Sequence, residues 1–289
     1  MKSMKLPHKK AKMTIRNGIV LVAVLLTLVV GLSACGDSTN VKDQTPPDLP
    51  PQESMNTDFS TFDQAPQKQN LNTQQAGFEH FTRAAFEAAA FKVILNANLF
   101  IPRAIFKAAT KVDPEGGNNG EWNWNYSVDA NGKVFKASLT GQKNKDAGHS
   151  TWQMYITNNQ TQPPFDNFLL FEGQSQLDGT SGYWIYYDWT QPDQQSRISR
   201  LDWSKKSENA LDLTLKVLSN RNNNINDVIE YQISDSTKMV TYTDASKSSE
   251  LKIHWNSETH AGYLIDPGYN SGEKACWDSN FQNVACTIN

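Results

Sequence analysis

The sequence is poor in the residues that build metal and redox centres. Its 289 residues include three cysteines and five histidines, and no Cys-x-x-Cys pair occurs. His254 and His260 are six positions apart, which is wider than the usual spacing of zinc ligands on one element. A Gly-x-Ser-x-Gly sequence, which marks many serine hydrolases, is also missing. The pattern therefore predicts no metal, no cofactor and no serine-hydrolase centre.

Long apolar runs are scarce as well. The most apolar segment, Ile19 to Ala34, has sixteen residues and is broken only by Thr27, Gly31 and Ser33. A helix needs about 20 apolar residues to cross a bilayer, so this segment is too short for a membrane span. Six basic residues and no acidic residue precede it. A basic region, a short apolar region and small residues before a cleavage point are the parts of a secretory signal, which we predict over residues 1–34.

The run Leu32-Ser33-Ala34-Cys35 at the end of this segment resembles the lipobox of a bacterial lipoprotein signal peptide. The resemblance implies cleavage before Cys35 and attachment of lipid to its thiol. The protein would then bind its membrane partner through this N-terminal lipid. One acyl chain holds a protein only marginally, so two or three are needed for a stable anchor. Gly36, and not an aspartate, follows the cysteine. We therefore expect a lipid-anchored protein of the bacterial cell envelope, in the outer membrane if the cell has one.

Basic residues are few in the expected mature protein. The whole chain has a net charge of −3, and loss of the six basic residues of the signal leaves 21 Lys and Arg against 30 Asp and Glu, a net charge of −9. An acidic protein repels phosphate backbones and anionic headgroups. Nucleic acid is therefore not an expected partner.

Residues 35–75 have little apolar surface. Pro46, Pro47, Pro50, Pro51 and Pro66 lie among Gln, Asn, Asp, Ser and Thr residues. Such a composition does not offset the entropy of ordering. We predict a disordered Pro/Gln/Asn-rich tether over 35–75, followed by one globular domain over 76–289.

The domain is predicted to be mainly β, of the α+β class. Residues of about 76–110 show helical periodicity and are apolar nearly all round, with Pro102 in the first turn of a second short helix. From about residue 121 to the end, apolar and polar residues alternate in segments separated by turns such as Asp178-Gly179. We expect the N-terminal helix to pack on a strongly curved antiparallel β-meander, or incomplete barrel, of about ten strands.

The two remaining cysteines, Cys276 and Cys286, form an even pair near the C-terminus. Nine residues separate them, which is unlike the spacing of a redox or zinc pair. In an oxidising envelope such a pair is typical of a structural disulfide. We predict that this disulfide clamps the last hairpin.

Aromatic residues give the main indication of a binding site. One segment carries rings at alternate and successive positions and therefore on both faces of a strand: Tyr183, Trp184, Tyr186, Tyr187 and Trp189. These rings fit cross-strand packing, a stacking platform for sugars, or a lining for acyl chains. Four carboxylates lie in the same region, at Asp178, Asp188, Asp193 and Asp202, and a glycosidase requires such a pair.

The expected architecture resembles that of the lipoprotein carriers of the outer-membrane localisation system, in which a curved antiparallel sheet wraps a helix around an acyl-binding cavity. The resemblance implies a membrane-anchored, non-enzymatic scaffold or binding module for a lipid or other apolar ligand. An alternative is a carbohydrate-active hydrolase or carbohydrate-binding protein that uses the sheet aromatics and carboxylates. A structural partner in an envelope complex is a third possibility. Whether the sheet encloses an apolar cavity or a filled core decides among them.

Overall fold

The chain from Glu115 onward forms one antiparallel sheet. The computed structural model describes residues 45–63, 77–117, 120–130, 132–220 and 223–286. These ranges leave out the predicted signal peptide, Cys35 and two parts of the predicted tether, 36–44 and 64–75. The strands are β1 Glu115–Gly116, β2 Glu121–Ala130, β3 Lys133–Asn144, β4 His149–Asn158, β5 Phe165–Gln176, β6 Ser181–Tyr187, β7 Arg197–Ser207, β8 Ala210–Val217, β9 Val228–Ser234, β10 Thr237–Asp244, β11 Ser249–Asn256, β12 Gly262–Ile265, β13 Ala275–Trp277 and β14 Asn283–Val284.

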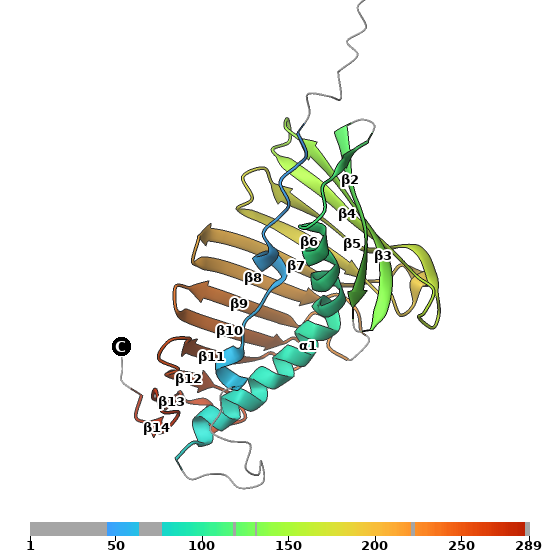
Figure 1. Cartoon of the computed structure of the whole chain (residues 1–289). Coiled ribbons are helices and arrows are strands. Elements are labelled where there is room, and N and C mark those ends of the chain that lie inside the picture. The colour runs from blue at the N-terminus through green and yellow to red at the C-terminus, as the bar shows by residue number, and fades with distance from the viewer. Residues whose placement is uncertain (1–44, 64–76, 118–119, 131, 221–222, 287–289) are drawn as a thin grey trace, which may run out of the picture. The chain divides into compact units, whose positions relative to one another are not determined.

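Each strand pairs with the next one along the chain, so the fourteen strands form an open meander in sequence order. Figure 1 shows them fanning from β2 at one end to β14 at the other. The predicted fold class is confirmed, but the expected number of about ten strands is too low. The additional strands β1, β12, β13 and β14 have two to four residues each. Such short segments show too few alternations to be detected as strands in a sequence.

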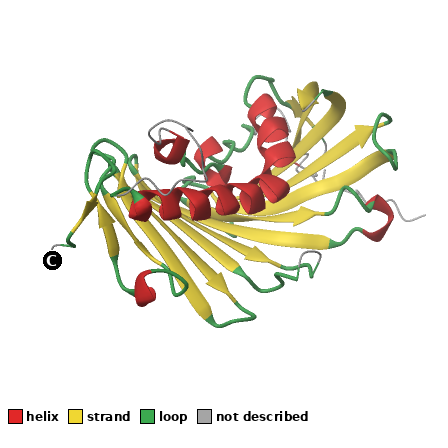
Figure 2. Ribbon diagram, turned by 90° about the horizontal axis from the view of Figure 1, so that it is seen from below, coloured by secondary structure: helices red, strands yellow, loops and turns green. Residues whose placement is uncertain are grey.

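One long helix, α1 Glu79–Ala109, lies across the concave face of the sheet (Figure 2). Its buried side includes Phe81, Phe91, Leu99 and Phe106. Among the described residues it is the one helix long and apolar enough to cross a membrane, yet it packs on the sheet as a core element. The expected second helix at Pro102 is wrong, because α1 continues through this residue. Figures 1 and 2 show α1 changing direction towards its C-terminal end, as a proline inside a helix typically causes.

Residues 45–63 are the main correction to the predicted organisation. They run beside α1 on the same face of the sheet (Figure 1) and contain two short 3-10 helices, η2 Gln52–Met55 and η3 Ser60–Asp63. Met55, Phe59 and Phe62 are buried in the common core. Three apolar anchors are enough to order a segment whose average composition is polar. The prediction of a disordered tether is therefore wrong for this part of residues 35–75.

Polar ties supplement these apolar anchors. Trp184 Nε1 on β6 donates a hydrogen bond of 3.2 Å to Ser54 Oγ. The ammonium of Lys238 on β10 forms an ion pair with Asp58, and Tyr231 on β9 donates from its hydroxyl to the Asp58 carbonyl at 3.0 Å. The segment is therefore bound to three separate strands.

Side chains alternate between an inner face, which meets α1, and an outer face. On β4, for example, Trp152, Met154 and Ile156 are buried, whereas the residues between them are more exposed. Several inner tryptophans lie directly opposite a glycine on the neighbouring strand: Trp152 opposite Gly141, Trp184 opposite Gly173, Trp203 opposite Gly182, and Trp277 opposite Gly262. Each indole ring occupies the space that a larger residue at the glycine position would need for its side chain. The inner face is therefore filled by the protein's own rings.

The predicted disulfide is present. Cys276 on β13 is bonded to Cys286, just beyond β14, with a Cα to Cα distance of 5.3 Å. The bond joins β13 to the residues after β14. It supplements the contacts of this end with α1, such as the hydrogen bond of 3.0 Å from His80 N–H to Asn283 Oδ1 and the packing of Phe281 on Phe81. A loop this short contributes roughly 2 to 3 kcal/mol in the chain-entropy estimate.

Candidate functional site

The five aromatic residues predicted as ligand contacts do not form one surface. Strand alternation directs Trp184 and Tyr186 of β6 to the inner face, where both are fully buried, and Tyr183 to the outer face. Tyr187 is also buried, at a register shift between β6 and β7. Trp189 lies beyond the end of β6 and meets Phe165 edge to face. Only Tyr183, which is half-buried, lies on the outer face with its ring towards a surface hollow.

Trp184 and Tyr186 are core residues. The Trp184 ring meets Phe106 of α1 and Phe171 of β5 at centroid distances of 5.5 and 5.3 Å. Burial raises the pKa of the Tyr186 hydroxyl well above its usual range, and the nearby Arg103 guanidinium offsets this only in part. Neither ring is accessible to a ligand.

The four carboxylates considered for glycoside hydrolysis each have a local role in the structure. Asp178 and Asp188 each cap a turn, by accepting hydrogen bonds from Thr180 and Thr190. Asp202 pairs with Arg200 on its own strand, and Asp193 lies in the short 3-10 helix η5 Pro192–Gln194. Their distribution over turns and a strand gives no paired acid and base.

The outer face does contain a polar hollow of about 560 Å³ over β2 to β6. We call it the outer hollow. Strand pairing arranges its polar side chains in two parallel rows that run across the strands. The first row is Glu121, Gln142, Thr151, Gln174 and Tyr183; the second is Thr140, Gln153, Glu172 and Ile185.

Each member of a row is the cross-strand partner of the next, so neighbours are about 4.8 Å apart along the row. Amide groups from three successive strands, on Gln142, Gln153 and Gln174, therefore lie on one surface. An amide both donates and accepts hydrogen bonds, as do the hydroxyls of Thr140 and Thr151. Two of these groups also have partners within the protein, since Thr140 Oγ1 donates to Asn123 Oδ1 at 3.0 Å and Gln153 Oε1 accepts from Tyr155 at 3.4 Å. The outer hollow thus has a regular array of neutral hydrogen-bonding groups.

A charged cluster closes one side of the outer hollow. Tyr187 donates its hydroxyl to Glu172 Oε1 at 2.7 Å, and Arg197 Nη2 lies 3.2 Å from the same oxygen. Burial, followed by the hydrogen bond to Glu172, raises the pKa of Tyr187. The hydrogen bond with Tyr187 is the main cause that raises the pKa of Arg197. Glu172 is therefore held between a neutral phenol and a permanent cation.

The Tyr183 ring is also fixed. Arg200 Cζ lies 4.1 Å from the ring centroid, which is a cation-π contact. Two nitrogens of Arg200 donate to the carboxylate of Asp202 at 2.6 and 2.8 Å, and this pairing raises the pKa of the guanidinium. A ring held in this way loses little conformational entropy when a ligand contacts it.

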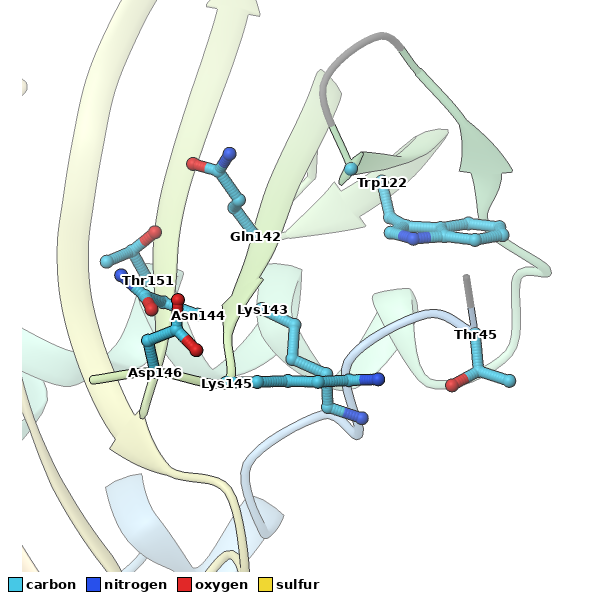
Figure 3. Close-up of a pocket in the computed structure, with 9 residues that line it drawn as sticks. Thr45, Trp122, Gln142, Lys143, Asn144, Lys145, Asp146 and Thr151 are labelled. Carbon is cyan, nitrogen blue, oxygen red and sulfur yellow. The ribbon is translucent and has the colours of Figure 1, made fainter. Parts of the chain in front are cut away.

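A second hollow, of about 460 Å³, adjoins the first at the end of the sheet. It lies where β2 begins and the β3–β4 hairpin extends further, and it shares Gln142 and Thr151 with the outer hollow. Figure 3 shows the Trp122 ring on one side, with the long side chains of Lys143 and Lys145 extending towards Thr45. This end hollow adds an aromatic ring and two ammonium groups to the polar surface.

The amide array was missed at the sequence level. Gln142, Gln153 and Gln174 occupy polar positions of alternating strands, and no sequence motif singles them out. They lie 11 and 21 residues apart, at intervals set by hairpin lengths. Only the register, which pairs Gln142 with Thr151 and Thr151 with Gln174, brings their side chains together.

The two histidines of the C-terminal region have separate aromatic partners. His254 stacks on Tyr263 with a centroid distance of 4.8 Å, and His260 stacks on Phe281 at 5.5 Å. Burial, with a smaller contribution from the charge of Lys274, lowers the pKa of His254. Within the part of the chain that the structure describes, no group of three or more His, Cys, Asp or Glu side chains could hold a metal ion.

No protein-family model, no curated protein and no solved structure matches the chain.

Proposed function

We propose that this protein is a membrane-anchored envelope lipoprotein whose curved sheet serves as a rigid, non-enzymatic module for binding saccharides. The anchor rests on the lipobox at Cys35. The ligand class rests on one observation, the two rows of amide, hydroxyl and aromatic side chains on the outer face.

The filling of the inner face argues against an apolar ligand. A carrier of acyl chains needs an apolar cavity between sheet and helix. Here α1 and residues 45–63 occupy this space, and their buried side chains form one cluster with the tryptophans of the sheet. Both hollows are lined mainly by polar side chains. The surface thus suits a hydrophilic ligand better than a lipid.

A saccharide matches the chemistry of the outer hollow. Its hydroxyl groups donate and accept hydrogen bonds, as the three glutamines and two threonines do in return. The apolar face of a sugar ring packs on an aromatic ring, and Tyr183 supplies one at the end of the first row. A row that crosses five strands suits an extended chain of several sugar units.

We assign Glu172 a positioning role. Its Oε1 accepts hydrogen bonds from both Tyr187 and Arg197. The carboxylate thereby orients these two side chains at the edge of the outer hollow.

The test is to present the purified full-length protein, extracted from membranes in detergent, to an array of neutral and acidic oligosaccharides. Binding to the best oligosaccharide is then measured by calorimetry. We expect Tyr183→Ala and Gln174→Ala each to weaken binding at least tenfold, or about 1.4 kcal/mol. Each substitution removes one contact at the Tyr183 end of the first row.

Tyr263→Ala is the matched control. Tyr263 is an outer-face tyrosine on β12 with a cation, Lys274 Nζ, 4.4 Å from its ring centroid, and it lies outside both hollows. This variant should bind as the wild type does. Equal losses in all three variants, no binding to any oligosaccharide, or copurified phospholipid held in the sheet would each refute the saccharide proposal.

A further inference from the structure

Helix α1 exposes an apolar stripe on the side that faces away from the sheet. Phe86, Val93 and Phe100 are 66%, 69% and 47% exposed. They are seven residues apart, so they lie in one line along the helix. Exposed aromatic and branched residues in a continuous line mark a contact surface.

The other exposed residues between Phe86 and Phe100 are uncharged. Ala89, Ala90, Asn96 and Ala97 are exposed and complete the line from Phe86 to Phe100, which we call the α1 stripe. In the most apolar 18-residue window of the helix, only 33% of the residues are buried. A helix that only covers a core would carry lysine and glutamate on this side.

Flanking contacts leave the stripe open. Lys92 on α1 pairs with Asp63 at 2.5 Å, and Arg103 donates to the Met55 carbonyl, so residues 45–63 lie against the flank of the helix. Arg83 pairs with both Glu87 and Asp266 at 2.7 Å. These contacts fix the helix on the sheet. Arg83 also reaches one end of the stripe, where its Cζ lies 5.6 Å from the Phe86 ring centroid, and Phe86 is still 66% exposed.

The length of chain before Thr45 limits what can cover the stripe. Nine residues separate Cys35 from Thr45. Ten Cα steps span at most about 36 Å in any conformation. A lipid on Cys35 therefore keeps Thr45 within this distance of the bilayer, much closer than a disordered tether of forty residues would.

The chain also leaves the domain on the face where α1 lies. Pro47 adjoins Gly141 and the ring of Trp152 on the inner face, and Gln52 donates to Thr110 Oγ1, next to the end of α1, at 3.2 Å. The short link to the anchor and the exposed stripe therefore share one side of the sheet.

We propose that the α1 stripe rests in the surface of the bilayer to which Cys35 is anchored. The inference depends on the lipid anchor of the proposed function. Phe86, Val93 and Phe100 would enter the boundary between headgroups and acyl chains, as the apolar side of an interfacial helix does.

The arrangement also orients the outer hollow. The stripe lies on the inner side of the sheet and the outer hollow on the opposite face. A membrane-seated α1 therefore directs the amide rows away from the bilayer, towards the polymers of the envelope.

The experiment places a nitroxide at position 93 of the full-length, lipidated protein through Val93→Cys. Cys276 and Cys286 are joined in a disulfide and Cys35 carries the lipid, so the new thiol is the single reactive one. The protein is reconstituted in vesicles of phosphatidylethanolamine and phosphatidylglycerol. Collision of the label with oxygen, which concentrates in lipid, is compared with collision with a water-soluble nickel chelate. Lys216→Cys, on the exposed outer side of β8, is the control.

We expect collisions with oxygen to dominate at position 93 and collisions with the nickel chelate to dominate at position 216. Phe86→Ser combined with Phe100→Ser should lower the ratio of oxygen collisions to nickel-chelate collisions at position 93 at least twofold, without lowering the melting temperature. Equal nickel accessibility at both positions would overturn the proposal, and so would dipolar coupling between labels at position 93 of two copies. The mass of the N-terminal peptide shows separately whether Cys35 carries lipid. A protein without this lipid would contradict the proposed function instead.

Discussion

At the scale of single residues, the pairing of glycine with tryptophan is the most specific feature of the core. A Cβ atom at Gly262 would lie 2.3 Å from the His254 carbonyl oxygen and 2.5 Å from Trp277 Cζ2, closer than packed atoms approach. At Gly173 the same atom would lie 2.2 Å from the Tyr183 carbonyl oxygen and 2.5 Å from Trp184. A flat ring over the backbone of the next strand is therefore possible only because the partner has no side chain.

We predict that Gly262→Ala destabilises the protein by about 1 to 3 kcal/mol, the usual cost of overpacking. Trp277 would have to leave its position, where Nε1 donates to the His260 carbonyl at 2.7 Å. Urea unfolding followed by tryptophan fluorescence measures the change. Gly268→Ala is the control, because the nearest atom to its added Cβ is the Asp266 carboxylate at 3.3 Å. Equal stability of the Gly262 variant and the wild type would contradict this account.

At the scale of elements, residues 45–63 show how a few contacts order a polar segment. Phe59 packs between Tyr231 and Trp255 at centroid distances of 5.5 and 5.7 Å. Beside it, Asp58 pairs with Lys238, a lysine that is itself buried. The pair ties the N-terminal segment to β10.

This ion pair predicts a pH dependence. Burial raises the pKa of Asp58, but the hydrogen bond and charge of Lys238, together with hydrogen bonds from Ser60, outweigh it and lower the pKa to about 2. In the unfolded chain an aspartate titrates near 3.9. The unfolded state therefore takes up the proton first, and the stabilisation present above about pH 4 is lost between about pH 4 and 2.

Asp58→Asn should lower the free energy of unfolding at pH 7 by no more than about 1 kcal/mol, because Asp58 is half exposed and screened by solvent. The difference from the wild type should narrow as the pH falls towards 2. Urea unfolding at pH 7, 4 and 2.5 measures it. Asp48→Asn, in the same segment, serves as a reference. A difference in the free energy of unfolding that grows on acidification would show that the predicted direction of the pH dependence is wrong.

At the scale of the whole molecule, the anchor and the sheet define one arrangement. The sheet presents a filled inner face and a polar outer face, and nine residues separate the proposed anchor from Thr45, the first residue that the structure describes. Under the proposed function, this arrangement confines the outer hollow to ligands in the envelope layer next to the bilayer.

We predict that Cys35→Ser prevents lipid attachment and leaves the precursor uncleaved. Cells fed radioactive palmitate should label the wild type and not this variant, and the variant should migrate more slowly in a denaturing gel because it retains residues 1–34. Cys276→Ser combined with Cys286→Ser is the matched control and should still be labelled. Labelling of the Cys35 variant would refute the lipobox interpretation.

Much of the fold follows from local patterns. The strands from β2 to β11 were predicted because each has enough alternating residues to show period two, and the disulfide followed from an isolated even pair of cysteines. The site did not follow. Gln142 and Gln174 are 32 residues apart, and only strand register places both next to Thr151. The core roles of Trp184 and Tyr186 also depend on which face of β6 meets α1.

The sequence by itself determined the mainly β class, the antiparallel meander with its leading helix, the disulfide and the expected lipid anchor, because each is encoded by neighbouring residues. The tertiary structure decided that residues 45–63 belong to the domain, that the inner face is filled, that three glutamines form one surface and that the α1 stripe stays exposed. Each of these depends on contacts between residues far apart in the chain, and local composition carries no information about such contacts.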